Sequence, residues 1–204
     1  MKTKLWLRPV VTVFVLCLAV AIVGLTGVRY LSKKSRYIIE ETLPSVSHMA
    51  LANQYRSEAF LHLICAVNAK EAAELRSEEK LVCSFSEKSK NELELLGASK
   101  GMSKHRQMFD DFMAERDHYI KTRDKIFMHC NTGNEAAAMQ EMVGKLLPMY
   151  ERYLNKGQDL VNYLCREGKR EAEAINTISS WIQIFTVISS ILIFFFGLIL
   201  GYTR

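Results

Sequence analysis

Hydrophobic residues are concentrated in two uninterrupted segments, one near each end of the chain. The segments span residues 10–28 and 181–202, and neither contains Asp, Glu, Lys or Arg. A helix rises by ~1.5 Å per residue, so each segment is long enough to cross the ~30 Å hydrocarbon core of a bilayer. Aromatic residues, which favour membrane interfaces, flank both segments: Trp6, Tyr30, Trp181 and Tyr202. The pattern predicts two transmembrane helices.

A cleaved signal peptide is the alternative for the first segment. Basic residues precede it, and Ala19-Val20-Ala21 has the small residues of a cleavage site. The apolar run nevertheless continues to Val28, which favours an anchor that is not cleaved.

The orientation of the two helices does not follow from the flanking charges, because Lys and Arg are almost equally frequent on both sides of the first segment. The default for a signal anchor places residues 1–9 and 203–204 in the cytoplasm and exports residues 29–180. We therefore expect a two-pass protein of the inner (cytoplasmic) membrane with a periplasmic or extracellular domain. The opposite topology stays open.

Between the two segments the sequence is polar and rich in residues that favour helices. Three breaks interrupt the helical pattern, at 67–73, 97–101 and 131–134. Four helices are expected: one that continues from the first segment to Val67, two at 72–96 and 102–130, and one that runs from Glu135 into the second segment.

Apolar residues recur in these helices at the seven-residue spacing of a bundle seam. The fourth helix carries such a series: Met139, Met142, Leu146, Met149, Tyr153, Leu160 and Tyr163. Short connections between long amphipathic helices make neighbouring helices antiparallel. The fold class is therefore all-α, an up-down-up-down antiparallel four-helix bundle between two transmembrane helices.

The charge of the chain does not indicate a nucleic-acid partner. The formal net charge is +5, but four of the 27 basic residues lie outside the middle domain, which leaves that domain nearly neutral against 22 acidic residues. Nucleic-acid binders need a basic face, and neither a basic block nor a base-stacking motif occurs here. We expect membrane lipid, and no nucleic acid, as a partner.

Three segments give the chain a specific likeness to a known family: Leu43-Pro44-Ser45-Val46, 109–127 (FDDFMAERDHYIKTRDKIF) and Pro148-Met149-Tyr150-Glu151-Arg152-Tyr153. With the two apolar segments around them, they resemble the four-helix-bundle sensor domain of bacterial methyl-accepting chemotaxis receptors. The resemblance implies an exported domain that binds a small molecule or a binding protein, forms a homodimer and signals through small displacements of the fourth helix and second span.

Such receptors continue past the second span into a HAMP linker and a cytoplasmic coiled coil. The present sequence stops at Thr203-Arg204. On the family's scheme, we expect that this polypeptide needs a further segment or a partner to reach a kinase.

Several polar residues occupy seam positions, where burial without partners is costly. At ~1.5 Å per residue, Arg56, Arg116, Tyr150 and Tyr153 fall roughly 20–30 Å from the distal tip and form one layer. Guanidinium groups bind carboxylates bidentately, so an anionic small-molecule ligand suits this layer. The candidate ligand-binding residues are Asn53, Arg56, Arg116, Tyr119, Arg123, Tyr150 and Tyr153.

A purely structural interpretation of these arginines is also open. Arg56 and Arg116 reach the surface in that case, or they pair with Glu58, Glu87 or Glu115. The resemblance favours a ligand, because related receptors bind ligand carboxylates through arginines of the first helix at the dimer interface. Arg56 is the residue that matches them here.

The sequence gives weaker support for a metal-binding or redox function. A di-iron bundle needs two Glu-x-x-His motifs, and Glu115 with His118 supplies one. His62, Cys65, His129 and Cys130 lie near the distal tip and define an alternative metal or redox sensor. Cys65, Cys83, Cys130 and Cys165 allow three disulfide pairings, with none favoured.

Enzymatic motifs are missing from the sequence: it has no phosphate-binding glycine loop, nucleophile elbow or HExxH. We therefore expect no cofactor and no enzymatic activity. A structural or assembly protein of the membrane remains the other alternative to a sensor.

Overall fold

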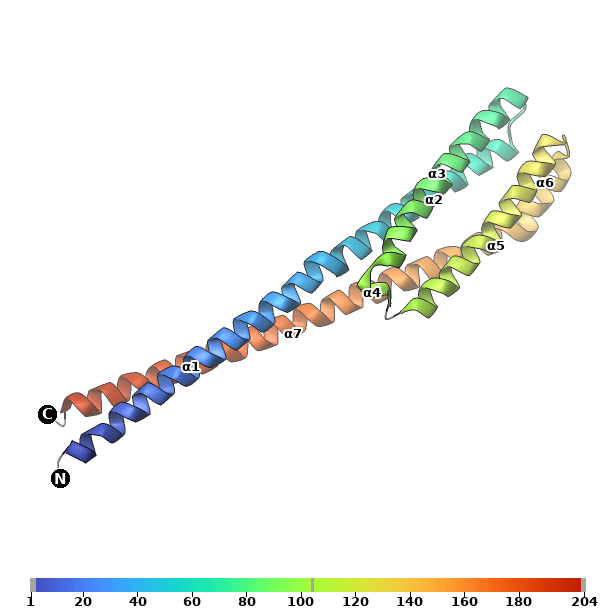
Figure 1. Cartoon of the computed structure of the whole chain (residues 1–204). Helices are drawn as coiled ribbons and strands as arrows, with labels where there is room; N and C mark the ends of the chain where they lie inside the picture. The colour runs from blue at the N-terminus through green and yellow to red at the C-terminus, as the bar shows by residue number, and fades with distance from the viewer. Residues whose placement is uncertain (1–2, 104, 203–204) are drawn as a thin grey trace. The chain divides into compact units, whose positions relative to one another are not determined.

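The structure, a computed structural model, describes residues 3–103 and 105–202, and it describes side chains within 11–198. The predicted interfacial residues Trp6 and Tyr202 and the basic residues before the first span lie outside the described side chains. Every element of the described part is helical (Figure 1). The chain divides into two units, residues 39–168 and residues 1–38 with 169–204, and each is described by itself.

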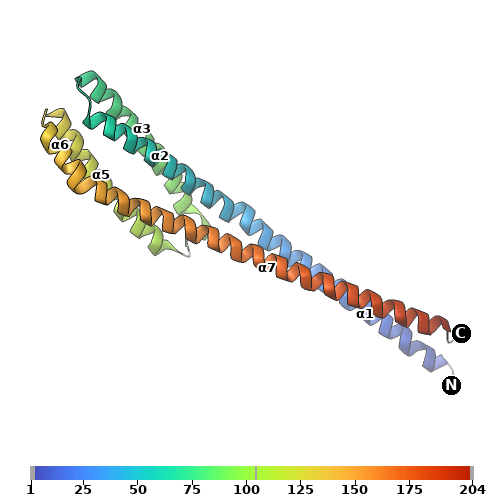
Figure 2. The same cartoon turned by 180° about the vertical axis from the view of Figure 1, so that it is seen from behind.

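The unit 39–168 contains α2 (Leu43–Val67), α3 (Ala72–Ala98), the short α4 (Lys100–Ser103), α5 (Arg106–Asn131), α6 (Glu135–Glu141) and the first part of α7 (Leu147–Tyr202). Both views show α2 beside α3, and α5 beside α6 and the adjoining part of α7 (Figures 1 and 2). The all-α class is confirmed, and the helices agree closely with the sequence prediction.

Contacts between side chains show that neighbouring helices are antiparallel. His48 pairs with Glu92 and His62 with Glu78, so residue numbers on α2 rise as those on α3 fall. Between α2 and α7, Phe60 stacks on Tyr150 and the guanidinium of Arg56 lies over Tyr153. The predicted up-down-up-down bundle is therefore confirmed.

The core of this unit runs along the four helices. Its largest fully buried side chains come from α2, α3, α4, α5 and the stretch 146–160: Met49, Leu63, Val82, Leu93, Leu96, Met102, Phe112, Ile126, Leu146 and Leu160. Each buried aliphatic or aromatic side chain stabilises the fold by roughly 1.5–3 kcal/mol relative to exposure. Packing along the seam therefore fixes the height of the polar residues that lie within it.

The turn after α5 explains why the chain reverses at the predicted break 131–134. Gly133 has a φ of 71°, a left-handed conformation that glycine adopts without a steric penalty. The backbone N–H of Asn134 donates to the carbonyl of His129, and that of Gly133 to Cys130. This pair of bonds is the Schellman motif, and the Asn134 side chain then caps the next helix at Ala137.

Two π-helical turns adjoin the two Leu-Pro pairs of the bundle. The turns are η1 (Ile38–Thr42), before Leu43-Pro44, and η2 (Met142–Leu146), before Leu147-Pro148. Proline has no N–H to donate and its ring crowds the preceding turn, so the helix widens there. The predicted fourth helix, from Glu135 into the second apolar segment, is therefore interrupted by a π-helical turn.

The extra residue of η2 corrects one seam position. Met139 was expected on the seam but is 42% exposed, whereas Ala138 is fully buried. A π-turn inserts one residue into the helix, and this rotates the preceding turn by about 100° relative to α7. The seam consequently shifts by one position before Met142.

The third helix also starts later than predicted. Met102 belongs to α4, and α5 begins at Arg106. His105, with φ −129° and ψ 32°, is not helical, so the chain turns between the two helices. Met102 is nevertheless fully buried, as its seam position implied.

The other unit consists of α1 (Thr3–Tyr37) and the second part of α7. Gly27 lets Ile182 approach so closely that a Cβ at residue 27 would lie 2.3 Å from its Cδ1. Lys34 forms an ion pair with Glu171 at 2.6 Å, and this hydrogen bond raises the pKa of Lys34. By length and composition, the described part of the chain has two helices that could cross a membrane.

The outward face of this unit is apolar. Its exposed side chains include Phe14, Leu18, Ile22, Leu25, Ile188, Phe194, Phe195 and Leu198. Such a continuous apolar face suits lipid better than water, because bilayer-facing helices have no need to bury it.

Candidate functional site

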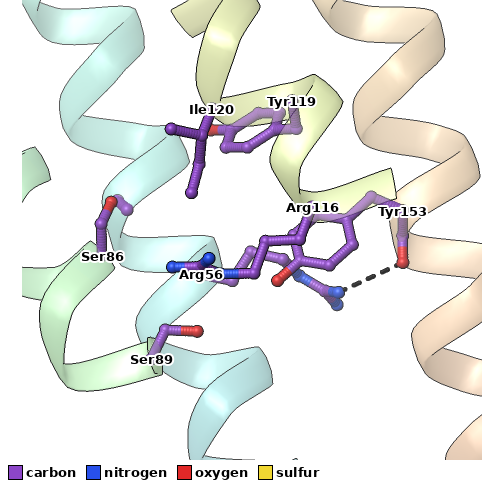
Figure 3. Close-up of a pocket in the computed structure, with 8 residues that line it drawn as sticks. Arg56, Ser86, Ser89, Arg116, Tyr119, Ile120 and Tyr153 are labelled. Carbon is purple, nitrogen blue, oxygen red and sulfur yellow. Dashed lines mark hydrogen bonds between the residues drawn. The ribbon is translucent and has the colours of Figure 1, made fainter. Parts of the chain in front are cut away.

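A small pocket lies inside the bundle, and residues of all four long helices line it (Figure 3). The lining consists of Arg56 and Ala59 from α2, Ser86 and Ser89 from α3, Arg116, Tyr119 and Ile120 from α5, and Tyr153 from α7. The cavity offers about 20 Å³ to the centre of a water molecule. That is room for about one water.

Arg56 is buried in this pocket without a counter-ion. Its residue is 5% exposed, and no carboxylate of the described residues lies within ion-pair distance of it. One Nη1–H donates to the backbone carbonyl of Tyr153 at 3.4 Å, and Cζ lies 4.6 Å from the centre of the Tyr153 ring. Its Nε–H is buried and has no hydrogen-bond partner in the described part of the chain.

Arg116 enters the pocket from the opposite side. Figure 3 shows its side chain extending from α5 toward Ser86 and Ser89 of α3, whereas Arg56 extends from α2 toward α7. The Arg116 side chain is 11% exposed, and it forms an ion pair with Asp117 at 3.6 Å. Because the Asp117 side chain is 64% exposed, solvent screens this pair strongly.

Arg123 differs from the other two arginines because its charge is paired. Its Nε and Nη2 donate to Oδ1 of Asp124 at 2.9 and 2.6 Å. Its Nη1 donates to Oγ of Ser86 at 2.7 Å. Arg123 therefore holds Ser86, a lining residue, and does not itself line the pocket.

Tyr119 and Tyr153 contribute neutral hydroxyl groups. Burial raises the pKa of both phenols above the ordinary value, so neither ionises at physiological pH. The hydroxyl of Tyr119 is buried without a hydrogen-bond partner among the described residues. Figure 3 shows the Tyr153 hydroxyl pointing into the pocket.

A close approach of α7 positions the guanidinium of Arg56. A Cβ on Gly157 would lie 3.0 Å from Nη1 of Arg56, 3.1 Å from Cε of Met49 and 3.2 Å from Cε2 of Phe112. The missing side chain at this position lets Arg56 reach the backbone of α7.

The structure brings together four of the seven candidate residues from the sequence: Arg56, Arg116, Tyr119 and Tyr153. Tyr150 lies beside them and stacks on Phe60 with ring centres 3.9 Å apart, but it does not line the pocket. Asn53 is half-buried outside the lining, and its Oδ1 has no partner in the described chain. The proposed glutamate pairs do not form: Glu115 pairs with Arg152 at 3.5 Å.

Sequence reasoning missed Ser86 and Ser89. Both lie on the α3 seam between Val82 and Leu93, at spacings of four, three and four residues. The sequence did contain a signal for them, because two small hydroxyl residues occupy successive seam positions where apolar residues are expected. Ser89 donates to the backbone carbonyl of Ala52 at 3.0 Å, whereas the hydroxyl of Ser86 accepts from Nη1 of Arg123 at 2.7 Å.

The alternative metal or redox sensor was assigned to His62, Cys65, His129 and Cys130. His62 bonds Glu78 through Nδ1 at 2.7 Å and stacks on Phe85. Within residues 3–103 and 105–202, no three His, Cys, Asp or Glu side chains are close enough to hold a metal ion. The five cysteines are free thiols, and burial raises the pKa of Cys130.

The described chain is an all-helical bundle with a buried polar layer, and its sequence has an apolar segment near each end. A family model described as "Four helix bundle sensory module for signal transduction" matches residues 1–179. The chain belongs to this family, as the resemblance implied, and the family is one of signal-transduction modules rather than enzymes. Neither the curated proteins nor the solved structures contain a significant match to the chain.

Proposed function

We propose that the protein is a membrane-anchored sensory module that binds a small anion inside its helical bundle. The observation that carries this proposal is the pair Arg56 and Arg116, two largely buried guanidinium groups in one pocket without a buried carboxylate in the described residues. Removing a charge from water costs several kcal/mol unless an opposite charge compensates it. An anion in the pocket supplies that compensation.

Binding would be transmitted through α7. Arg56 lines the pocket and also contacts both the backbone and the ring of Tyr153 on α7. An anion competes with the Tyr153 carbonyl for the same guanidinium, so binding alters how α2 holds α7. Helix α7 is uninterrupted from Leu147 to Tyr202, which includes the second apolar segment. A coupling of roughly 1–3 kcal/mol is typical of such ligand-driven shifts.

We propose the topology expected from the sequence, with residues 29–180 outside the cytoplasm and both apolar segments, 10–28 and 181–202, in the inner membrane. The thiols of Cys65, Cys83 and Cys165 are exposed in the bundle. In intact cells they should react with a membrane-impermeant maleimide. Labelling that requires cell lysis would indicate the opposite orientation.

We also propose that two copies associate through α2. The exposed residues of α2 carry no charge; Leu43, Ser47, Ala50, Gln54, Ser57 and Leu61 recur at seven-residue spacing, and Cys65 follows one turn after Leu61. An uncharged stripe at this spacing suits a second, identical helix. Mild oxidation should then join two chains through Cys65, and Cys83→Ser should not prevent this. A monomer after oxidation, with Cys65 still reactive, would count against the dimer.

The test of the anion site is calorimetry on the full chain in neutral-detergent micelles. Succinate and sulfate serve as probes because both are small and negatively charged. Arg56→Met and Arg116→Met should abolish the binding heat, whereas Arg76→Met, an exposed arginine of α3, should preserve it. If neither anion binds the folded protein, the structural or assembly role becomes the better explanation.

A further inference from the structure

The lining of the interior pocket consists of hydrogen-bond donors and lacks acids. Uncommitted donors are the Nε–H of Arg56, the hydroxyl of Tyr119 and the outer N–H groups of Arg116. The hydroxyl of Ser86 accepts from Arg123, so its own proton is available. No Asp, Glu, Asn or Gln belongs to the lining. A ligand that satisfies these groups must accept hydrogen bonds.

The charge of the lining is close to two positive units. Arg56 has no carboxylate partner among the described residues, and Arg116 has a solvent-screened one. Arginine remains protonated at any physiological pH. Arg123 adds less to the imbalance, because it does not line the pocket and its Nη2 lies 2.6 Å from Oδ1 of Asp124. One negative charge would leave a buried guanidinium unpaired, whereas two would balance both.

The same lining disfavours an ammonium group. An ammonium needs oxygen acceptors and a nearby negative charge, and the pocket offers two guanidinium groups instead. Like charges at short range in a poorly solvated site repel strongly. In this pocket, the carboxylates of an amino acid therefore favour binding, whereas its ammonium group opposes binding.

The size of the pocket limits the ligand further. The cavity holds about one water, and Ala59 and Ile120 contribute apolar side chains to its lining. The rings of Tyr119 and Tyr153 form further walls, with centres 5.9 Å apart. A compact ligand requires the least outward movement of these side chains.

We infer that the pocket selects a compact dianion that carries no ammonium group, and that it discriminates against zwitterionic amino acids. This inference rests on the proposed anion site and adds its ligand class. Short dicarboxylates and tetrahedral inorganic dianions share the required chemistry, with two negative charges and acceptor oxygens only.

Two matched pairs of probes test the inference by calorimetry on the full chain in neutral-detergent micelles at pH 7.5. Succinate and aspartate differ by the amino group. Sulfate and methanesulfonate share a tetrahedral head and differ by one charge. We expect the dianion of each pair to bind at least about tenfold more tightly. The stronger of succinate and sulfate then identifies a dicarboxylate or an inorganic dianion as the source.

Single-arginine variants sharpen the test. Arg116→Gln removes one of the two charges while keeping a polar side chain. This variant should weaken sulfate binding by at least about tenfold. The affinity for sulfate divided by the affinity for methanesulfonate should also fall toward one. Arg76→Gln, on the surface of α3, should leave both the affinity and the ratio unchanged.

The outcomes separate this inference from the anion site itself. If aspartate binds as tightly as succinate, or methanesulfonate as tightly as sulfate, and binding still needs Arg56, the selectivity is wrong and the anion site stands. If none of the four probes binds to protein that is helical by circular dichroism, both the anion site and its selectivity are wrong.

Discussion

Two regions of the same bundle differ in whether their ionisable side chains have partners. Along the interface of α2 and α3, His48 faces Glu92 and His62 faces Glu78, each at 2.7 Å, and the four side chains are 20–29% exposed to solvent. The two pairs lie fourteen residues apart, so they occupy equivalent positions two heptads apart. In the interior pocket, by contrast, Arg56 has no acidic partner among the described residues.

The difference separates polar pairs that organise the fold from a charge that is available to a ligand. A hydrogen-bonded pair that still contacts solvent adds up to about 1 kcal/mol, and it also fixes the register of two helices. A buried arginine without a counter-ion lowers stability and has no register to set. The polar layer therefore makes physical sense as a binding site whose cost the surrounding apolar core offsets.

The largest expected effect comes from the core that supports the pocket. Phe112 is almost fully buried and packs on Tyr153, with ring centres 5.0 Å apart. Phe112→Ala removes this packing and leaves a cavity, so it should lower the free energy of unfolding by about 3–5 kcal/mol. Thermal unfolding of the full chain in micelles, followed by circular dichroism, measures the loss. A cost below that of breaking a histidine–glutamate pair would contradict the contrast between the regions.

The next effect has the opposite sign. Arg56→Met replaces the buried guanidinium with an apolar side chain of similar length. Without ligand it should raise the free energy of unfolding by roughly 1–2 kcal/mol, because an uncompensated charge disappears while the packing remains. The same thermal unfolding experiment measures the gain, which should be accompanied by loss of anion binding.

Its matched control is Arg123→Met, since Arg123 is equally buried but is paired with Asp124 and Ser86. This variant should lose stability, because it leaves two polar partners without their donor. If both variants shift stability in the same direction, pairing does not distinguish the two arginines.

Much of the fold followed from the sequence because its signals are local. Gly133 and Asn134 form the turn that their residue types indicated. The displacement of Met139 by Ala138 on the seam did not follow, since the one-residue insertion of η2 is a response of the whole helix to Pro148. Periodicity alone assumes a regular helix and cannot count that residue.

The site was predictable in part for a related reason. Helical rise and seam position placed Arg56, Arg116 and Tyr153 at one height, and the pocket contains all three. Pairing depends on side-chain directions that periodicity does not specify. Arg123 turns to its neighbour Asp124, although its seam position suggested the ligand layer, and Glu115 pairs with Arg152 on α7 instead of with Arg56 or Arg116.

A smaller effect is expected at the α2–α3 interface. Glu92→Gln and Glu78→Gln each weaken one histidine pair, and each should lower the free energy of unfolding by about 0.5–1 kcal/mol. The two losses should add, because the pairs are too far apart to share partners. Glu87→Gln, at an exposed position of α3, provides the control. Losses that exceed those of core substitutions would mean that these pairs, and not packing, dominate the bundle.

The smallest effect at neutral pH concerns Tyr119, and it should grow with alkalinity. Tyr119→Phe removes a buried hydroxyl without a partner in the described chain, so stability should rise by up to about 1 kcal/mol. Burial raises the pKa of Tyr119 above the ordinary value of 10.0, so the unfolded chain releases this proton at a lower pH than the folded chain. Wild-type stability should therefore fall as pH rises above about 10, and Tyr119→Phe should lessen the fall. Thermal unfolding between neutral pH and pH 11 measures both slopes. Equal slopes would mean that the Tyr119 hydroxyl is hydrated in the folded protein, and the pocket would then lose one of the donors assigned to the ligand.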